Sequence, residues 1–170
     1  RSFVAPESLF IDIMMNVGIV FYAAEQTDDA ELLHKAKEHC LTTRKYLVRG
    51  DGSTSHEGIF DRSTGEFLRQ TTHQGWRNDS SWARGLTWAL YGFGTVYDFT
   101  RDGRFLQTAE ACADFFIEHT PAHGVPPNDW DEPNPALPYE SSAAAIAASG
   151  MLNLSKLTGD AARARRYRDY

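Results

Sequence analysis

The chain has 170 residues, of which 42% are hydrophobic and 24% are charged, and these fractions are typical of a globular protein with one real core. Its formal net charge of −6 argues against a nucleic-acid partner, because phosphate binding requires a basic surface. No apolar run approaches the roughly 20 residues of a membrane-spanning helix, so we expect no membrane insertion.

The hydrophobic pattern predicts mostly helices joined by short turns. Residues 7–25 are apolar nearly all round, which indicates a buried helix, and residues 29–48 are amphipathic. Asp79 or Ser80 is expected to cap the third helix. In chain order the predicted elements are helices at 7–25 and 29–48, a short hairpin at 56–70, helices at 81–99 and 104–118, a proline-rich loop at 121–138, a helix at 140–157 and a sixth helix that begins near Ala161.

A repeat runs through this order of elements. The same Thr-x-Asp pattern ends an apolar helix and opens a more polar one at Thr27-Asp28-Asp29, Thr100-Arg101-Asp102 and Thr158-Gly159-Asp160. An inner helix, a short turn and an outer amphipathic helix make one αα-hairpin. Stacked hairpins need neighbours to cover their inner faces, so three units predict about half of an all-α toroid.

The ends and the cysteines of the chain bear on its context. The chain starts at Arg1 without a methionine or signal peptide and stops at Tyr170 inside a predicted helix. We therefore expect a piece of a longer protein, whose compartment the sequence does not indicate. Cys40 and Cys112 each lie inside a helical pattern, and two cysteines do not make a disulfide framework, so we predict buried thiols.

The stretch from residue 71 to residue 88 concentrates side chains that recognise sugars. An indole stacks on the apolar face of a sugar ring, and a guanidinium clamps a carboxylate through two parallel hydrogen bonds. We therefore predict a surface for an anionic, ring-shaped ligand, although aromatic residues at helical spacing are more often core. The residues concerned are His73, Gln74, Trp76, Arg77, Trp82, Arg84 and Trp88.

Asp12 is the first candidate for a reactive group. No other charged residue occurs between Glu7 and Glu25. A carboxyl group among apolar neighbours holds its proton more readily than one in water, which suits a general acid near neutral pH. The alternative is a buried Asp that hydrogen-bonds a neighbouring helix or caps one.

Other polar residues near these segments have two interpretations each. His56 follows a Gly-Ser-Thr-Ser turn and either reaches back to a site or is a solvated loop histidine. The same two interpretations hold for His73, and Gln74 is placed to orient a water or a sugar hydroxyl. Residues 140–142, Glu-Ser-Ser, are most simply a capping segment of the fifth helix, with the mouth of the toroid as the alternative location.

The histidines do not form a metal-binding pattern. His34 and His39 are five residues apart on an outer helix, and therefore do not share a face. His119 and His123 are four apart but straddle Pro121, which ends the helix. We predict no metal site.

Several of these segments, in this order, resemble the unsaturated glucuronyl hydrolases of glycoside hydrolase family 88. The resemblance covers essentially the whole chain, and its later part is the Ser-Ser-Ala helix within residues 139–150. The motifs that carry it are Ile11-Asp12-Ile13-Met14-Met15-Asn16, Arg49-Gly50-Asp51-Gly52-Ser53 through His56, Thr72-His73-Gln74-Gly75, Asp79-Ser80-Ser81-Trp82-Ala83-Arg84-Gly85 and Trp88-Ala89-Leu90-Tyr91-Gly92-Phe93.

The resemblance implies an (α/α)6 barrel with a central pocket, of which residues 1–170 are about half, as part of one catalytic domain truncated at both ends. It also implies a glycoside hydrolase that removes a 4,5-unsaturated glucuronic acid from the non-reducing end of oligosaccharides left by polysaccharide lyases. Asp12 matches the family's general acid and base. Its carboxyl would protonate C4 of the enol ether, and its carboxylate would then help water add at C5.

By the same match, His56 and Gln74 resemble groups that hydrogen-bond the sugar or its water, Trp82 and Trp88 resemble the aromatic wall, and Arg84 resembles a substrate-binding cation. No metal or organic cofactor is implied. The family's second pocket carboxylate lies upstream of Arg1, and Glu140 stands where the family usually has Asp. Two alternatives remain, an unsaturated rhamnogalacturonyl hydrolase on the same barrel and a non-catalytic carbohydrate-binding toroid.

Overall fold

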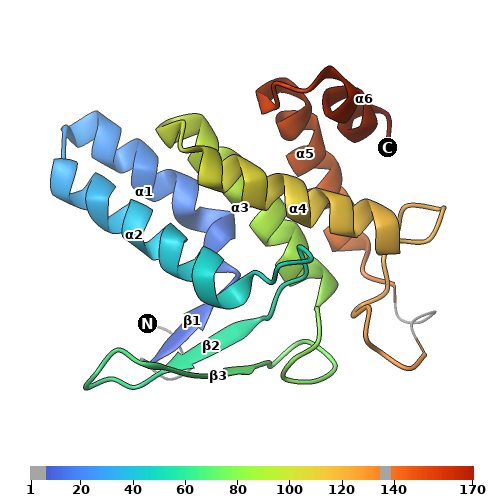
Figure 1. Cartoon of the computed structure of the whole chain (residues 1–170), viewed down its shortest axis with the longest axis horizontal. Helices are drawn as coiled ribbons and strands as arrows, with labels where there is room; N and C mark the ends of the chain where they lie inside the picture. Colours follow the sequence, from blue (N-terminus) through green and yellow to red (C-terminus); the bar gives the residue numbers. More distant parts are fainter. Residues whose placement is uncertain (1–6, 135–138) are drawn as a thin grey trace.

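Six helices and a small sheet make up the computed structural model, which describes residues 7–134 and 139–170 (Figure 1). The helices form three consecutive pairs, as predicted. The pairs are α1 (Ile13–Thr27) with α2 (Ala30–Leu47), α3 (Ala83–Thr100) with α4 (Gly103–His119), and α5 (Ser141–Leu157) with α6 (Ala161–Asp169). No helix in the described ranges is both long and apolar enough to cross a membrane.

The three Thr-x-Asp turns confirm the predicted repeat. The carboxylate of Asp29 accepts a hydrogen bond from the backbone N–H of Leu32 at 2.9 Å at the start of α2. Asp102 accepts one from Arg104 at the start of α4, and Asp160 accepts two in the first turn of α6. Each second helix of a pair therefore begins at a side-chain N-cap, which satisfies N–H groups that the helix itself cannot pair.

Helix α3 lies at the centre of the arrangement. It packs against α1, α4 and α5, which bury most of its surface and leave a partly exposed stripe that includes Arg84 and Trp88. Gly92 allows the close approach to α1, since a Cβ atom at this position would lie 2.3 Å from the carbonyl oxygen of Met14. The inner helices α1, α3 and α5 therefore stand side by side, with α3 between the other two (Figure 1).

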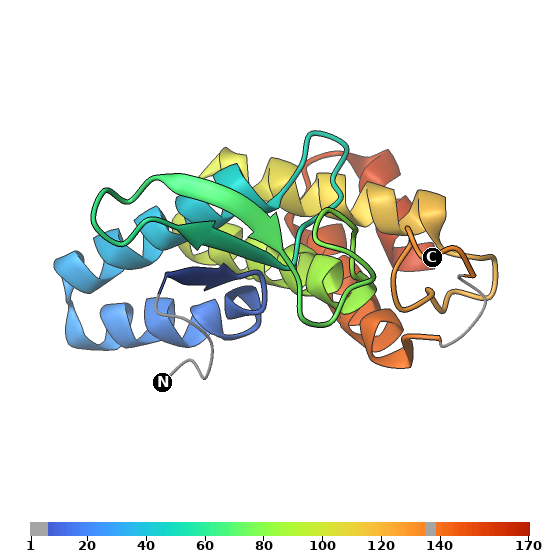
Figure 2. The ribbon, with the colours of Figure 1, turned by 90° about the horizontal axis from the view of Figure 1, so that it is seen from below.

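A three-stranded antiparallel sheet covers one end of the first hairpin (Figure 2). Its strands are β1 (Ser8–Phe10), β2 (Glu57–Phe60) and β3 (Phe67–Thr71), with β2 in the middle. The hairpin of β2 and β3 was predicted, but β1 was not. The predicted helical start at residue 7 is therefore wrong, because residues 8–10 pair with β2 and α1 begins only at Ile13.

The start of α3 also differs from the prediction. Trp82 is the N-cap residue, and neither Asp79 nor Ser80 caps the helix. Instead the described part of the proline-rich loop reaches α3, where the backbone N–H of Ala83 donates to the carbonyl oxygen of Asn128 at 2.9 Å. Residues 135–138 of that predicted loop lie outside the described residues.

Both cysteines are free and fully buried in the helical core, as predicted. Burial raises the pKa of the Cys40 thiol to about 12, and it raises the pKa of Cys112 to about 12 as well. Both thiols therefore stay protonated near neutral pH and serve as small apolar side chains.

Candidate active site

Asp12 lies at the junction of β1 and α1. It is the N-cap residue of α1, but its side chain makes no capping hydrogen bond, so the alternative of an Asp that caps a helix does not apply to its carboxylate. Its side chain is 34% exposed, and its Oδ2 atom is buried without a hydrogen-bond partner among the described residues. Asp12 thus differs from the expected helix-interior residue, and its carboxylate does not cap the helix that it precedes.

His56 is the nearest charged or ionisable neighbour of this carboxylate. Its Nε2 atom lies 3.2 Å from Oδ2 of Asp12. The imidazole is only 3% exposed and packs against the rings of Phe10 and Trp82, with ring centroids at 5.2 and 4.8 Å. The interpretation of His56 as a solvated loop residue is therefore wrong.

The backbone hydrogen bond that His56 accepts favours one of its two tautomers. Its Nδ1 atom accepts a hydrogen bond from the backbone N–H of His73 at 3.1 Å and lies 3.1 Å from the hydroxyl of Thr72. A nitrogen that accepts a hydrogen bond carries a lone pair, so a neutral imidazole has its proton on the other nitrogen. The N–H of His56 is then at Nε2, on the side of Asp12.

Backbone pairing brings Asp12 and His56 together. The N–H of Ile11 donates to the carbonyl oxygen of His56 at 2.9 Å, and Phe10 pairs with Glu57 in the sheet. The residues that follow β1 and precede β2 therefore meet at one corner of the sheet. This main-chain contact fixes the separation of the two side chains.

Arg84 is the centre of a second group of contacts. Its Nη2 donates to Oε1 of Gln74 at 2.7 Å, and its guanidinium carbon lies 4.6 Å from the centroid of the Trp82 ring. The Gln74 amide nitrogen in turn lies 3.5 Å from Nε2 of His56. A cation over an indole face is stabilised by the ring quadrupole, so Trp82 supports Arg84 and also packs against the ring of His56.

Glu140 also contacts this guanidinium. Nη1 of Arg84 donates to the two carboxylate oxygens of Glu140 at 3.2 and 3.4 Å, and it lies 3.4 Å from the hydroxyl of Ser142. Glu140 is the N-cap residue of α5 but makes no side-chain capping bond. The simplest prediction for this segment, helix capping, is therefore wrong for the Glu140 side chain, whose carboxylate balances the charge of Arg84.

The two predicted indoles occupy different environments. Trp82 is 1% exposed in this chain and backs the group of polar residues. Trp88 lies one helical turn after Arg84, is partly buried against the core, and has its ring edge-on to Tyr91 at 6.3 Å. Within the described ranges, the structure thus brings together five of the six predicted site residues and leaves Trp88 beside them.

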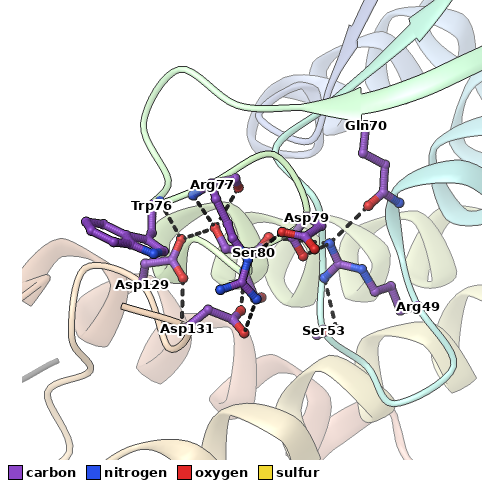
Figure 3. A network of polar contacts seen from close by, with 10 residues as sticks. Arg49, Ser53, Gln70, Trp76, Arg77, Asp79, Ser80, Asp129 and Asp131 are labelled. Atoms are coloured by element: carbon purple, nitrogen blue, oxygen red, sulfur yellow. Dashed lines mark hydrogen bonds and ion pairs between the residues drawn. The ribbon is translucent and has the colours of Figure 1, made fainter. Parts of the chain in front are cut away.

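A buried carboxylate holds the loop that carries Gln74 (Figure 3). Oδ2 of Asp129 accepts hydrogen bonds from the N–H of Trp76 at 2.9 Å and from the hydroxyl of Ser80 at 2.6 Å. Asp131, two residues on, accepts one from the N–H of Ser81 at 3.0 Å. The proline-rich loop therefore anchors the segment between β3 and α3.

Arg49 fastens the same segment from the other side. Its guanidinium donates to the carbonyl oxygen of Asp79 at 2.7 Å and to the side chains of Ser53 and Gln70, each at 3.1 Å (Figure 3). Burial lowers the pKa of Arg49, and Asp51 and other nearby carboxylates oppose this effect. The loop before α3 is thus held by polar contacts from two distant segments.

Sequence reasoning missed four acidic residues of this region, namely Glu57, Asp129, Asp131 and Glu140 as a partner of Arg84. Glu57 directly follows His56, and this adjacency is the one local signal that was present. Asp129 and Asp131 flank a tryptophan in an irregular loop, a pattern with no defined meaning in one sequence. Their partners are far away along the chain, so only the fold shows their contacts.

Taken together, these contacts bring together the carboxylate of Asp12, the imidazole of His56 beside it, and a guanidinium that rests on an indole. Stacked αα-hairpins that carry such a group at one end are the arrangement expected of a helical-barrel glycoside hydrolase. Residues 3–157 match the family model of Glycosyl Hydrolase Family 88, and the chain belongs to this family.

Curated relatives support this family assignment. The chain is 37% identical over 148 residues to an unsaturated glucuronyl hydrolase of Bacillus sp. (strain GL1). The aligned region covers 86% of this chain and 39% of the relative. It is 30% identical over 155 residues to an unsaturated chondroitin disaccharide hydrolase of Streptococcus pyogenes serotype M1, with 89% of this chain and 38% of the relative covered. The chain thus spans about two fifths of the length of these curated relatives.

The fold agrees with the crystal structure of the unsaturated glucuronyl hydrolase from Bacillus sp. GL1. The two superimpose with a TM-score of 0.91 at 34% identity, over 98% of this chain and 46% of that one. An unsaturated glucuronyl hydrolase structure from Streptococcus agalactiae superimposes with a TM-score of 0.84 at 30% identity. The predicted (α/α)6 fold is therefore confirmed, and the three hairpins correspond to about half of the matched structures.

Proposed function

We propose that the full-length protein is a hydrolase that removes 4,5-unsaturated glucuronic acid from the non-reducing end of lyase-generated oligosaccharides. The observation that carries the proposal is the 3.2 Å approach of the Asp12 carboxylate to the buried imidazole of His56. Membership of family 88 and the named relatives support the choice of substrate class.

The proposed chemistry is hydration of an enol ether rather than displacement at the anomeric carbon. The neutral carboxyl of Asp12 gives its proton to C4 of the double bond, which leaves cationic character at C5. The resulting carboxylate takes a proton from water as the water oxygen bonds to C5. The hemiketal formed there opens, and the hemiacetal that this exposes at C1 releases the next sugar.

The surrounding residues bind and orient in this proposal. Nε2 of His56, 3.2 Å from Oδ2 of Asp12, stabilises the negative charge left on Asp12 after proton transfer. Gln74 contacts the sugar or the attacking water, and Arg84 attracts the uronic acid, although Glu140 shares its guanidinium. Trp82 backs these groups from the core, and Trp88 forms an apolar wall beside them.

We also propose that the full-length protein closes these hairpins into one barrel, so that residues 1–170 are part of a single catalytic domain. Helix α1 exposes Met15, Ile19 and Tyr22 along one face, with exposed fractions of 42%, 69% and 54%. In the proposed barrel a further hairpin covers this face, and its side chains complete the pocket around Asp12. The length of the curated relatives supports this arrangement.

The direct test incubates the full-length protein with unsaturated uronyl disaccharides and follows the loss of ultraviolet absorbance of the conjugated double bond. We expect turnover with the wild type and a fall in kcat of about 10²-fold or more in Asp12→Asn, because the amide cannot supply the proton. Substrate binding, measured by calorimetry on the variant, should change little. Unchanged turnover in Asp12→Asn would refute the assigned role.

The choice of disaccharide separates the alternatives. Turnover restricted to substrates with a rhamnose next to the unsaturated uronic acid would favour a rhamnogalacturonyl hydrolase. Binding without turnover of any of these substrates by the wild type would favour a non-catalytic carbohydrate-binding protein.

A further inference from the structure

Glu57 is a buried carboxylate with no apparent task in the fold. Its side chain is 1% exposed, and neither of its carboxylate oxygens has a hydrogen-bond partner in the part of the chain that the structure describes. Removing a carboxylate from water costs several kcal/mol unless a charge or donor compensates it. A residue of this kind therefore requires an explanation from its surroundings.

The group that faces Glu57 is the imidazole of His73. Nε2 of His73 lies 3.1 Å from Oε2 of Glu57, and the other side of the ring is open, with the side chain 54% exposed. The ring rests near Phe10 and stands edge-on to His56, with centroids at 5.9 and 6.2 Å. His73 therefore contacts the buried carboxylate and also stands beside His56 of the proposed site.

His73 acts on His56 through its main chain. Its backbone N–H donates to Nδ1 of His56, the bond that leaves the proton of His56 on the nitrogen facing Asp12. The side chain and the N–H of His73 share one Cα atom, so a contact that holds the ring also restrains the direction of the N–H. The contacts form a continuous path from Glu57 through His73 and His56 to Asp12.

We propose that Glu57 is a positioning residue of the active site. Its carboxylate holds the His73 side chain, and the backbone N–H of His73 thereby keeps His56 in the tautomer with its proton on Nε2. Without Glu57, the segment after β3 moves and His56 also populates the tautomer with its proton on Nδ1, which turns a lone pair toward Asp12. The effect on the reaction rests on the proposed function, whereas the tautomer itself does not.

The kinetic test uses the full-length protein and four variants, Glu57→Gln, His73→Ala, the double variant and the control Glu66→Gln. Glu66 lies exposed in the same hairpin, so its substitution makes the same chemical change away from the path. We expect kcat to fall roughly tenfold in both single variants with little change in KM, since a wrong tautomer impairs proton transfer rather than binding. The double variant should lose no more than either single one, and Glu66→Gln should match the wild type.

Multiplied losses in the double variant, or a rise in KM with unchanged kcat, would overturn the proposal. His73→Ala changes a half-exposed side chain and carries the test if Glu57→Gln does not fold. The kinetic arm alone, however, depends on the proposed activity.

A second readout separates the two proposals. Nitrogen-15 NMR of the histidine rings reports which nitrogen of His56 carries the proton, with no substrate present. We expect the Nε2–H tautomer in the wild type and in Glu66→Gln, and a mixture in Glu57→Gln and His73→Ala. This result in a protein that is inactive on unsaturated disaccharides would retain the role of Glu57 and reject the proposed function; an unchanged tautomer in both variants would reject the role of Glu57.

Discussion

Arg84 shows how much a single side chain contributes to the proposed site. Its guanidinium simultaneously contacts Gln74, Glu140 and the face of Trp82. A planar fork with several donors is needed for this, and the ammonium group of a lysine cannot reproduce it. The charge of Arg84 is partly balanced by Glu140, so its geometry matters at least as much as its charge.

We therefore expect Arg84→Lys to raise KM about tenfold, the effect of losing a charged hydrogen bond, with a smaller change in kcat. The measurement is steady-state kinetics of the full-length protein on an unsaturated disaccharide. Arg62→Lys is the matched control, because Arg62 is exposed at the turn of the hairpin. An equal KM in wild type and Arg84→Lys would mean that Arg84 does not contribute to substrate binding.

At the level of single helices, the start of α4 allows a test of how the Thr-x-Asp turns stabilise the fold. The pKa of Asp102 is lowered from 3.8 to about 2, first because the Arg104 side chain hydrogen-bonds the carboxylate. A carboxylate with a lowered pKa in the folded state stabilises the protein at pH above 3.8, and this contribution is lost as the pH falls toward 2. We expect Asp102→Ala to lower the free energy of unfolding by about 1 kcal/mol at neutral pH.

The measurement is urea unfolding of the full-length wild type and variant at a series of pH values. The difference between their free energies of unfolding should shrink as the pH falls from 3.8 toward 2. A difference that stays constant down to pH 2 would show that the ionised carboxylate of Asp102 is not the source of the stabilisation.

The contact between α1 and α3 gives a second prediction at this scale. An alanine in place of Gly92 gains roughly 1 kcal/mol of helix propensity. Its Cβ atom, however, would lie 2.3 Å from the carbonyl oxygen of Met14, and overpacking of this kind costs roughly 1–3 kcal/mol. Because the overlap is with main chain that cannot rotate away, we expect a net loss of stability.

Thermal unfolding of the full-length protein should thus show a lower Tm for Gly92→Ala than for the wild type. Gly159→Ala is the matched control, since no atom lies within 4 Å of a Cβ atom built there. Equal Tm values for both variants would indicate that α1 and α3 can move apart without loss of thermal stability.

For the whole molecule, the exposed face of α1 distinguishes a half barrel from an independent domain. Ile19 is 69% exposed in this chain. If a further hairpin covers it in the full-length protein, Ile19→Glu buries an unpaired charge there and lowers the Tm. In the isolated 170-residue chain the same change removes apolar surface from water contact, so it should raise solubility.

We expect Ile19→Glu to lower the Tm of the full-length protein, measured by thermal unfolding. The same change should raise the solubility of the isolated chain, measured by sedimentation. The unchanged isolated chain should associate or unfold readily. A cooperative, monomeric thermal transition of that chain, with Ile19→Glu harmless in the full-length protein, would contradict the half-barrel proposal.

The helical repeat was predictable because its signals are local. Each Thr-x-Asp turn places an N-cap acceptor directly before an amphipathic helix, and all three turns form as expected. Strand β1 was not predictable in this way. Residues 8–10 belong to a continuous apolar run, and they become a strand only because β2, which follows much later in the chain, pairs with them.

The residues of the candidate site were likewise predictable only where their signal is local. Asp12, His56, Gln74 and Arg84 were recognisable by their chemistry and by their family resemblance. The roles of Glu57 and Asp129 were not, because each depends on a partner that the fold supplies, namely His73 in one case and the Trp76 segment in the other. Trp82 was read as an open aromatic surface, and its burial follows from the rings and loops that pack on it.

The placement of Asp12 by backbone pairing has a consequence for how such proteins diversify. The spacing of Asp12 and His56 depends on the main-chain hydrogen bond between Ile11 and His56, which any side chain other than proline at residue 11 leaves in place. The segment that carries Gln74 is held separately, by Asp129 and Arg49. Mutations can therefore reshape the segment that carries Gln74 while the spacing of Asp12 and His56 stays constant, which makes this segment the natural target for directed evolution of the proposed substrate preference.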